Sequence, residues 1–171
     1  MSYNAARPLN PWRWLGLPAV LCLVASLAFA TPIRVFGLQL PEPVFAMVPA
    51  FAWGVIRPSV LAPFVLVLIG VLLDALWGSS LGLWGLSLLI AYAAVLFTRS
   101  WMSGQSPPIL WAWYVSVTAL ALLAAYLFTM MDAKGAVSPV ALFWQLAWTA
   151  ILYPFAHRLI GRFEDADVRF K

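Results

Sequence analysis

The chain has 171 residues, of which 64% are hydrophobic and only 9% are charged. Soluble domains carry about 25% charged residues, so this composition indicates an integral membrane protein and leaves no length for a soluble catalytic domain. The formal net charge of +4 comes from Lys and Arg residues that flank apolar runs. Because no basic stripe with interleaved aromatic residues is present, we expect no nucleic-acid partner.

Six apolar runs follow one another with short polar connections. A spanning helix needs about 20 apolar residues, so this length accommodates five or six spans and little else. We therefore expect an all-α, polytopic transmembrane bundle that forms a single domain. The expected spans cover about residues 14–30, 42–56, 60–77, 81–98, 109–131 and 139–156, and a polar cytoplasmic tail covers 157–171.

The first run has two interpretations. A basic start, an apolar core and the small-residue site at residues 28–30 are typical of a cleavable signal peptide. Pro32 close after that site, and Trp12 and Trp14 as an interfacial anchor, favour a retained span instead. We expect residues 1–30 to be retained, whereas cleavage would leave five spans.

The second run, residues 44–56, is short for a full crossing. The bilayer must thin around it, neighbouring helices must shield it, or residues 41–43 must extend it. Ala46, Ala50 and Gly54 place a small side chain at every fourth position, which lets another helix come close. We therefore expect this run to be a site of close helix packing.

Positive residues are divided unequally between the two sides of a six-span chain. One side receives Arg34 and Lys134. The other side receives eight residues: Arg7, Arg13, Arg57, Arg99, Arg158, Arg162, Arg169 and Lys171. Because cytoplasmic loops carry the excess of Lys and Arg, we expect the second side, and both termini, to be cytoplasmic.

Tryptophans mark the predicted boundaries. Eight of them fall near run ends, where we expect them at headgroup level: Trp12, Trp14, Trp53, Trp77, Trp84, Trp101, Trp111 and Trp113. Trp144 and Trp148 instead lie in the middle of the last run, four residues apart and beside Gln145. We expect their face to pack on another helix.

Candidate catalytic groups are sparse in this sequence. The single histidine, His157, follows the last run and is expected to be interfacial, and the single cysteine, Cys22, is expected to be a buried thiol. Metal-ligand spacing, a Gly-rich phosphate loop, and a nucleophile with a nearby base are all absent. We therefore expect no enzyme activity, no metal and no cofactor.

Asp74 is the one carboxylate inside an apolar run rather than at its edge. A charged side chain at membrane depth costs a few kcal/mol on insertion scales, so it usually has a partner or a task. A membrane aspartic peptidase would need a second carboxylate, and Asp132 falls toward the same outer face. Asp132, however, lies near Lys134 in a loop and is typical of a solvated turn residue, so we expect no peptidase site.

The expected role of Asp74 is structural. It lies about one turn from the end of its run, where it can accept hydrogen bonds from residues 79–80 or from the start of a neighbouring helix. Gly70, Gly78 and Gly82 share its four-residue spacing, which keeps successive helical positions on one face. The alternative is a docking point for another membrane protein, with these glycines clearing the surface around it.

The same residues carry a resemblance to a known family. Residues 41–43 begin the second span, Arg57-Pro58 closes it, and a glycine, an aspartate and two further glycines follow at four-residue intervals. In these features, residues 41–97 resemble MreD, the rod-shape-determining membrane protein of bacteria. The family positions correspond here to Arg57, Pro58, Gly70, Asp74, Gly78 and Gly82.

This resemblance implies a non-enzymatic scaffold of the bacterial inner membrane that contributes to rod shape and organises peptidoglycan synthesis. The implied partners are an MreC-like membrane protein, an MreB-like filament reached directly or indirectly, the elongation-specific peptidoglycan synthases and membrane lipids. No cofactor is implied. The family fold is similar to the substrate-binding components of energy-coupling-factor transporters.

That similarity supplies an alternative, a transporter subunit that captures a vitamin-type molecule. Such a site needs several polar or aromatic groups that converge in a pocket. The outer loops offer few polar side chains: Arg34, Gln39, Glu42, Asp132 and Lys134. The scaffold is therefore the favoured interpretation.

The tail at 157–171 is expected to be solvated at the membrane surface, with contact to a cytoplasmic filament as the alternative.

Overall fold

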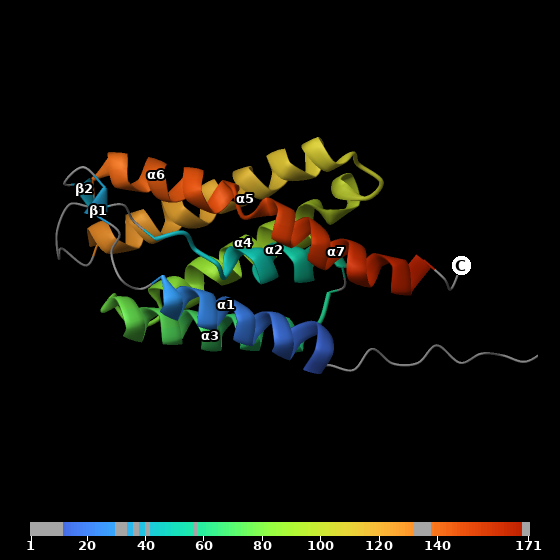
Figure 1. The fold of residues 1–171 in the computed structure, drawn as a ribbon, viewed down its shortest axis with the longest axis horizontal. Coiled ribbons are helices and arrows are strands. Elements are labelled where there is room, and N and C mark those ends of the chain that lie inside the picture. The colour runs from blue at the N-terminus through green and yellow to red at the C-terminus, as the bar shows by residue number, and fades with distance from the viewer. Residues whose placement is uncertain are drawn as a thin grey trace, which may run out of the picture.

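The protein is a helical bundle (Figure 1). A computed structural model describes residues 12–29, 34–35, 38–39, 42–56, 58–131 and 138–168, and the side chains of 14–29, 42–56, 58–131 and 138–162 among them. The described helices are a π-helical turn η1 (Trp12–Gly16), α1 (Leu17–Ala28), α2 (Met47–Ile56), α3 (Leu61–Trp77), α4 (Leu83–Met102), α5 (Pro107–Met131), α6 (Pro139–Ala150) and α7 (Tyr153–Val168). Two strands of two residues each, β1 (Arg34–Val35) and β2 (Leu38–Gln39), pair antiparallel.

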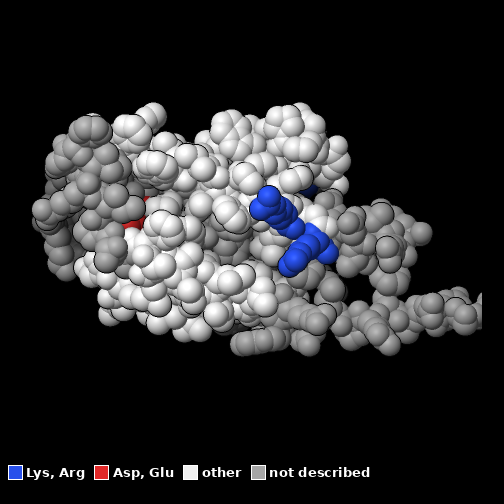
Figure 2. Space-filling view, viewed as in Figure 1, with Lys and Arg blue, Asp and Glu red and all other residues white. Residues whose placement is uncertain are grey.

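Within the described residues, three helical segments are long and apolar enough to cross a membrane. They are α4, α5 and the stretch Pro139–Arg162, which comprises α6 and most of α7. The stretch Trp14–Ala28, α2 and α3 are apolar but shorter. Figure 2 shows a described surface that is almost uncharged on this side, as expected for a helical membrane protein. The number of spans stays a prediction.

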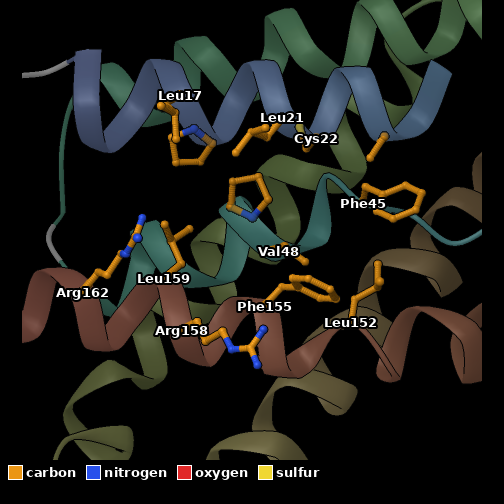
Figure 3. Close-up of a pocket in the computed structure, with 13 residues that line it drawn as sticks. Leu17, Leu21, Cys22, Phe45, Val48, Leu152, Phe155, Arg158, Leu159 and Arg162 are labelled. Carbon is orange, nitrogen blue, oxygen red and sulfur yellow. The ribbon is translucent and has the colours of Figure 1, made fainter. Parts of the chain in front are cut away.

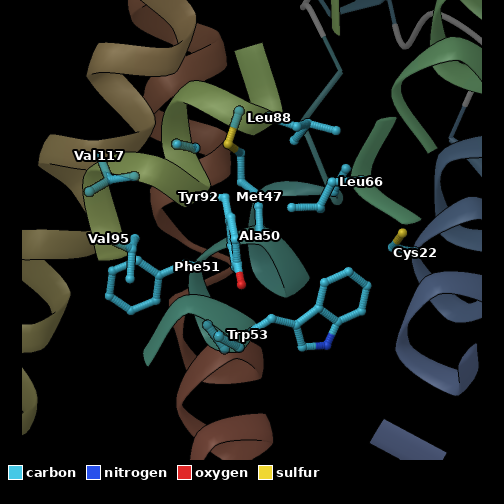
Figure 4. Close-up of a cluster of buried hydrophobic side chains, with 14 of the residues drawn as sticks. Cys22, Met47, Ala50, Phe51, Trp53, Leu66, Leu88, Tyr92, Val95 and Val117 are labelled. Atoms are coloured by element: carbon cyan, nitrogen blue, oxygen red, sulfur yellow. The ribbon is translucent and has the colours of Figure 1, made fainter. Parts of the chain in front are cut away.

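The short helix α2 lies at the centre of the bundle. It packs mainly against α4 and α7 and also contacts α1, α3 and α5. Phe51, Ala52 and Trp53 are at most 1% exposed, and they belong to one cluster of buried side chains (Figure 4). Of the three ways to accommodate this short run, the structure therefore shows shielding by neighbouring helices.

Small side chains on α2 allow α4 to pack closely against it. Ala46, just before the helix, and Ala50 are completely buried. A Cβ atom added to Gly54 would lie 2.6 Å from Cγ1 of Val95 on α4, closer than side chains tolerate. The predicted close packing of this run is confirmed.

The interfacial assignment is wrong for three tryptophans. Trp14, Trp53 and Trp84 are only 7%, 0% and 6% exposed, so they belong to the core rather than to a headgroup belt. Trp53 lies on the largely buried helix α2, and its indole Nε1 donates a hydrogen bond to the carbonyl oxygen of Trp14 at 2.9 Å. The polar edge of this ring is thereby satisfied inside the protein.

The face of α6 that carries Trp144 and Trp148 also differs from the prediction. These side chains are 43% and 40% exposed, and Phe143 beside them is 64% exposed. This face therefore points away from the bundle and does not pack into the core of this chain. In a membrane it would meet lipid or another protein.

The last predicted span is divided into two helices. Pro154 has no N–H group to offer to the carbonyl oxygen of Ala150, so the helical ladder is interrupted there. The indole of Trp111 donates to this carbonyl at 3.3 Å, and the Tyr114 hydroxyl donates to the neighbouring carbonyl of Thr149 at 3.2 Å. The helix then resumes as α7 and continues to Val168 instead of ending at residue 156.

Helices α3 and α4 are in close backbone contact where Gly70 faces Gly85. A Cβ atom added to Gly70 would lie 2.2 Å from the backbone nitrogen of Gly85 and 2.3 Å from its Cα. A Cβ added to Gly85 would instead find its nearest neighbour, the Val67 carbonyl oxygen, at an ordinary 3.6 Å. The contact thus requires glycine on the α3 side only.

We predict that Gly70→Ala destabilises the protein by roughly 2 kcal/mol or more, because the backbone of α4 must move to relieve the overlap. Gly85→Ala, the matched control across the same contact, should leave stability unchanged or slightly raise it. Unfolding of the purified variants in mixed detergent micelles measures both. Equal effects of the two substitutions would contradict the assigned contact.

Candidate functional site

The site centres on Asp74 in the last turn of α3, at the connection to α4. The helix ends at Gly78, which has a left-handed backbone (φ 64°), and the N–H groups of Gly78 and Ser79 both bond the carbonyl oxygen of Asp74. No atom lies within 4 Å of a Cβ built on Gly78, so glycine is needed there for its backbone conformation rather than for space.

The carboxylate of Asp74 bonds the start of the next helix. Its Oδ2 accepts a hydrogen bond from the N–H of Gly82 at 2.7 Å, and its Oδ1 accepts one from the N–H of Trp84 at 3.1 Å. The Ser79 hydroxyl donates a third bond to Oδ1 at 2.6 Å. Two oxygens of one side chain therefore hold the turn and the first turn of α4 together.

This arrangement provides hydrogen-bond acceptors for the first N–H groups of α4. The first N–H groups of a helix have no partner within that helix, and a side chain at the cap position normally accepts one of them. Here the cap position is Gly82, which has no side chain and a left-handed backbone (φ 92°). Asp74 supplies the missing acceptor from the preceding helix, and its negative charge lies at the positive end of the α4 dipole.

The burial of Asp74 is fully compensated within the described residues. The residue is 1% exposed, and every buried side-chain nitrogen or oxygen in the described part of the chain has a hydrogen-bond partner. A carboxylate held in this way is engaged in structure. A partner protein could therefore reach Asp74 only through the turn that it organises.

A second group of polar contacts fixes the residues before α2 beside this turn. The indole of Trp77 donates to Oε2 of Glu42 at 2.9 Å, and its ring packs edge-on against Trp84 with centroids 5.0 Å apart. The amide of Gln145 on α6 donates to the backbone carbonyl of Glu42 at 3.2 Å. The Asp74 turn, the start of α2 and α6 are thus joined at one end of the bundle.

Thr149 connects the same region to α6. Its hydroxyl accepts a hydrogen bond from the Val44 N–H at 3.1 Å and donates one to the carbonyl of Gln145 at 2.7 Å. Thr149 is completely buried. Sequence reasoning missed this residue because a lone threonine in an apolar run has no distinctive pattern, and its partner lies 105 positions away.

The structure separates the residues that the four-residue spacing had grouped. Gly70 and Asp74 do share the buried face of α3. Gly78 and Gly82 lie in the turn rather than on a helical face, and a Cβ atom built on either would meet no atom within 4 Å. Gly85, not Gly82, lies against Gly70. The turn between the predicted third and fourth spans is confirmed, and it takes Gly78 and Gly82 off the helical face that Gly70 and Asp74 share.

The connection from α2 to α3 can be described only in part. Arg57 lies outside the described residues, and Pro58 is exposed. Ser59 follows, and its Oγ accepts a hydrogen bond from the Leu61 N–H at 3.2 Å, at the start of α3. The Tyr92 hydroxyl on α4 accepts the Ser59 N–H at 3.2 Å, which fixes this connection to the bundle.

The candidate catalytic groups do not assemble in the described part of the chain. Asp132, the second carboxylate considered for a peptidase, lies outside it. No three His, Cys, Asp or Glu side chains come together there to hold a metal ion. His157 is exposed and stacks on the Tyr153 ring at 5.8 Å, and Cys22 is buried, as expected.

Comparison of the chain with protein-family models, with curated proteins and with solved structures gives no match. The geometry of the site itself therefore carries the functional argument.

We predict that Asp74→Ala lowers the free energy of unfolding by roughly 2–4 kcal/mol, because it leaves two N–H groups at the start of α4 without acceptors. Asp74→Asn keeps one acceptor oxygen and should cost about half as much. Ser79→Ala removes one donor only and should cost about 1 kcal/mol. An Asp74→Ala variant as stable as the wild type in the micellar unfolding measurement would contradict the capping role.

We predict that Thr149→Val destabilises the protein by about 1–3 kcal/mol, because the buried Val44 N–H loses its acceptor. Thr129→Val is the matched control, since that hydroxyl bonds only the Ala125 carbonyl of its own helix at 2.8 Å. The control should change stability by less than about 0.5 kcal/mol. Similar losses of stability in the two variants would contradict the assigned role of Thr149 in holding residues 42–44.

Proposed function

We propose that the protein is a non-enzymatic scaffold of the bacterial inner membrane, of the MreD type, that supports rod shape by binding other membrane proteins. Six spans with both termini in the cytoplasm belong to this proposal. So does a helix arrangement similar to the substrate-binding components of energy-coupling-factor transporters. Its partners would be an MreC-like protein, the elongation peptidoglycan synthases and, directly or through them, an MreB-like filament.

The observation that carries the proposal is that both carboxylate oxygens of Asp74 accept hydrogen bonds from within the chain. An intramembrane carboxylate usually serves transport, proton transfer or structure. The hydrogen bonds from Ser79, Gly82 and Trp84 engage this one in holding the α3–α4 connection. This connection is also the part of the chain that resembles MreD. The hairpin of α3 and α4, whose turn is fixed by Asp74 and by two glycines, suits a protein that presents a fixed surface to partners.

The distribution of charge supports the proposed orientation. The acidic side chains that the structure describes, Glu42 and Asp74, lie at the end of the bundle where α3 turns into α4. Figure 2 shows described Lys and Arg side chains toward the opposite end. Arg99 ends α4 there, and Arg158 and Arg162 lie on α7. That positive end would face the cytoplasm.

Capture of a vitamin-type molecule is the second candidate, because the described chain does contain a cavity, of about 470 Å³. A site that orients a polar vitamin needs several convergent hydrogen-bonding groups. The side chains that line this cavity are apolar except for Cys22 and two arginines at one end. The lining therefore favours the scaffold over this alternative.

The scaffold proposal predicts co-purification of an MreC-like protein from bacterial membranes with the tagged wild-type chain. Asp74→Ala should reduce recovery of this partner at least several-fold and should widen the cells, because the hairpin loses its fixed geometry. Ser116→Ala is the matched control: its hydroxyl is exposed and bonds only the Ala112 carbonyl at 2.9 Å, so recovery should not change.

Membrane levels of each variant, measured on the same samples, separate loss of binding from loss of protein. Unchanged partner recovery and unchanged cell width in Asp74→Ala at normal membrane levels would contradict the proposal. A rise in thermal stability on addition of one compound from a vitamin panel, with no partner recovered, would favour the transporter subunit instead.

A further inference from the structure

A groove of about 470 Å³ runs between α1 and α7, with α2 beneath it (Figure 3). Helices α1 and α7 both rest on α2 and leave this space between them. Its volume is in the range of small-molecule sites. The lining residues are Leu17, Pro18, Leu21, Cys22, Ala25, Phe45, Val48, Pro49, Leu152, Phe155, Arg158, Leu159 and Arg162.

The walls of the groove continue onto the outside of the bundle. Leu17 and Leu21 on α1 are 48% and 60% exposed, and Phe155 on α7 is 58% exposed. The apolar surface is therefore accessible from the side that would face the membrane interior. A hydrocarbon chain can enter such a space without passing through water.

One end of the groove is positively charged. Arg158 and Arg162 are four residues apart, so they lie on one face of α7, and both contribute to the lining. In Figure 3, Arg162 extends from α7 toward α1, whereas Arg158 points away from α1, so a shared ligand requires the Arg158 side chain to turn toward Arg162. Neither guanidinium forms an ion pair with a carboxylate of the described side chains, whose acidic members, Glu42 and Asp74, are engaged by Trp77 and by the α4 start.

We propose that this groove binds an anionic glycerophospholipid, with an acyl chain along the apolar walls and the phosphate group on Arg158 and Arg162. Guanidinium groups bind phosphate oxygens through paired hydrogen bonds, and basic pockets between membrane helices hold anionic headgroups. An apolar helix of a partner protein would fill the walls but bring no negative charge to the arginines. This site is independent of the proposed scaffold function.

The purified full-length protein in a neutral detergent tests the site. Phosphatidylglycerol should raise the melting temperature by several degrees more than phosphatidylcholine with the same acyl chains. The double variant Arg158→Gln/Arg162→Gln should lose this difference. Arg99→Gln, the control for a general attraction of cations to anionic lipid, should keep it, because Arg99 lies on α4 and outside the groove.

A second variant tests the apolar part of the groove while both arginines remain. Ala25→Phe places a ring among the lining side chains of α1 and should reduce the phosphatidylglycerol effect by more than half. Soluble glycerol 3-phosphate should produce no comparable shift at the same concentration. Equal shifts with the two lipids, a lipid difference that survives in the double variant, or a full shift with glycerol 3-phosphate would each overturn the proposal.

The occupant in native membranes can be identified by a photoreactive amino acid at Leu21. The proposal predicts an adduct with the mass of an anionic phospholipid on the intact chain. A crosslink to a second copy of this chain or to another protein in place of lipid would overturn it and would identify the groove as a protein interface.

Discussion

The structure depends on one hydrogen-bonding requirement, the need of the first N–H groups of α4 for an acceptor. Gly82 cannot provide one, so Asp74 provides it from the end of α3. In an apolar environment an unpaired backbone group is expensive, and so is an unpaired carboxylate. In this connection the backbone N–H groups and the Asp74 carboxylate bond one another, so neither is left unpaired. The pairing fixes both the position of the turn and the direction in which α4 leaves it.

Close packing follows from that fixed direction. Gly70 lets the backbone of α4 pass at Gly85, and Gly54 lets α2 approach the same helix beside Val95. Helix α2 is thereby enclosed, which explains how a helix of ten residues can sit in this bundle. Contacts from Trp77 and Gln145 to Glu42 then hold the residues that lead into it. The result is a rigid end of the molecule beside the Asp74 turn.

Much of this fold could be predicted from the sequence, because long apolar runs, prolines and small residues at four-residue intervals act locally. The membrane class, the helices and the capping interaction of Asp74 depend on such signals. The partners of Thr149, the burial of Trp53 and the role of Gly85 could not be predicted, because each depends on contacts between distant segments. The break before Pro154 had a local signal, but a proline can also be accommodated in a continuous span.

Backbone hydrogen exchange across residues 78–86 tests the central claim most directly. The account predicts that the amides of Gly82 and Trp84 are protected in the wild type and exchange at least tenfold faster in Asp74→Ala, while α5 keeps its protection. The same comparison in Ser79→Ala should show a smaller change, because both backbone bonds to the carboxylate remain. Unchanged protection of these two amides in Asp74→Ala would contradict the account, since α4 would then begin without its acceptor.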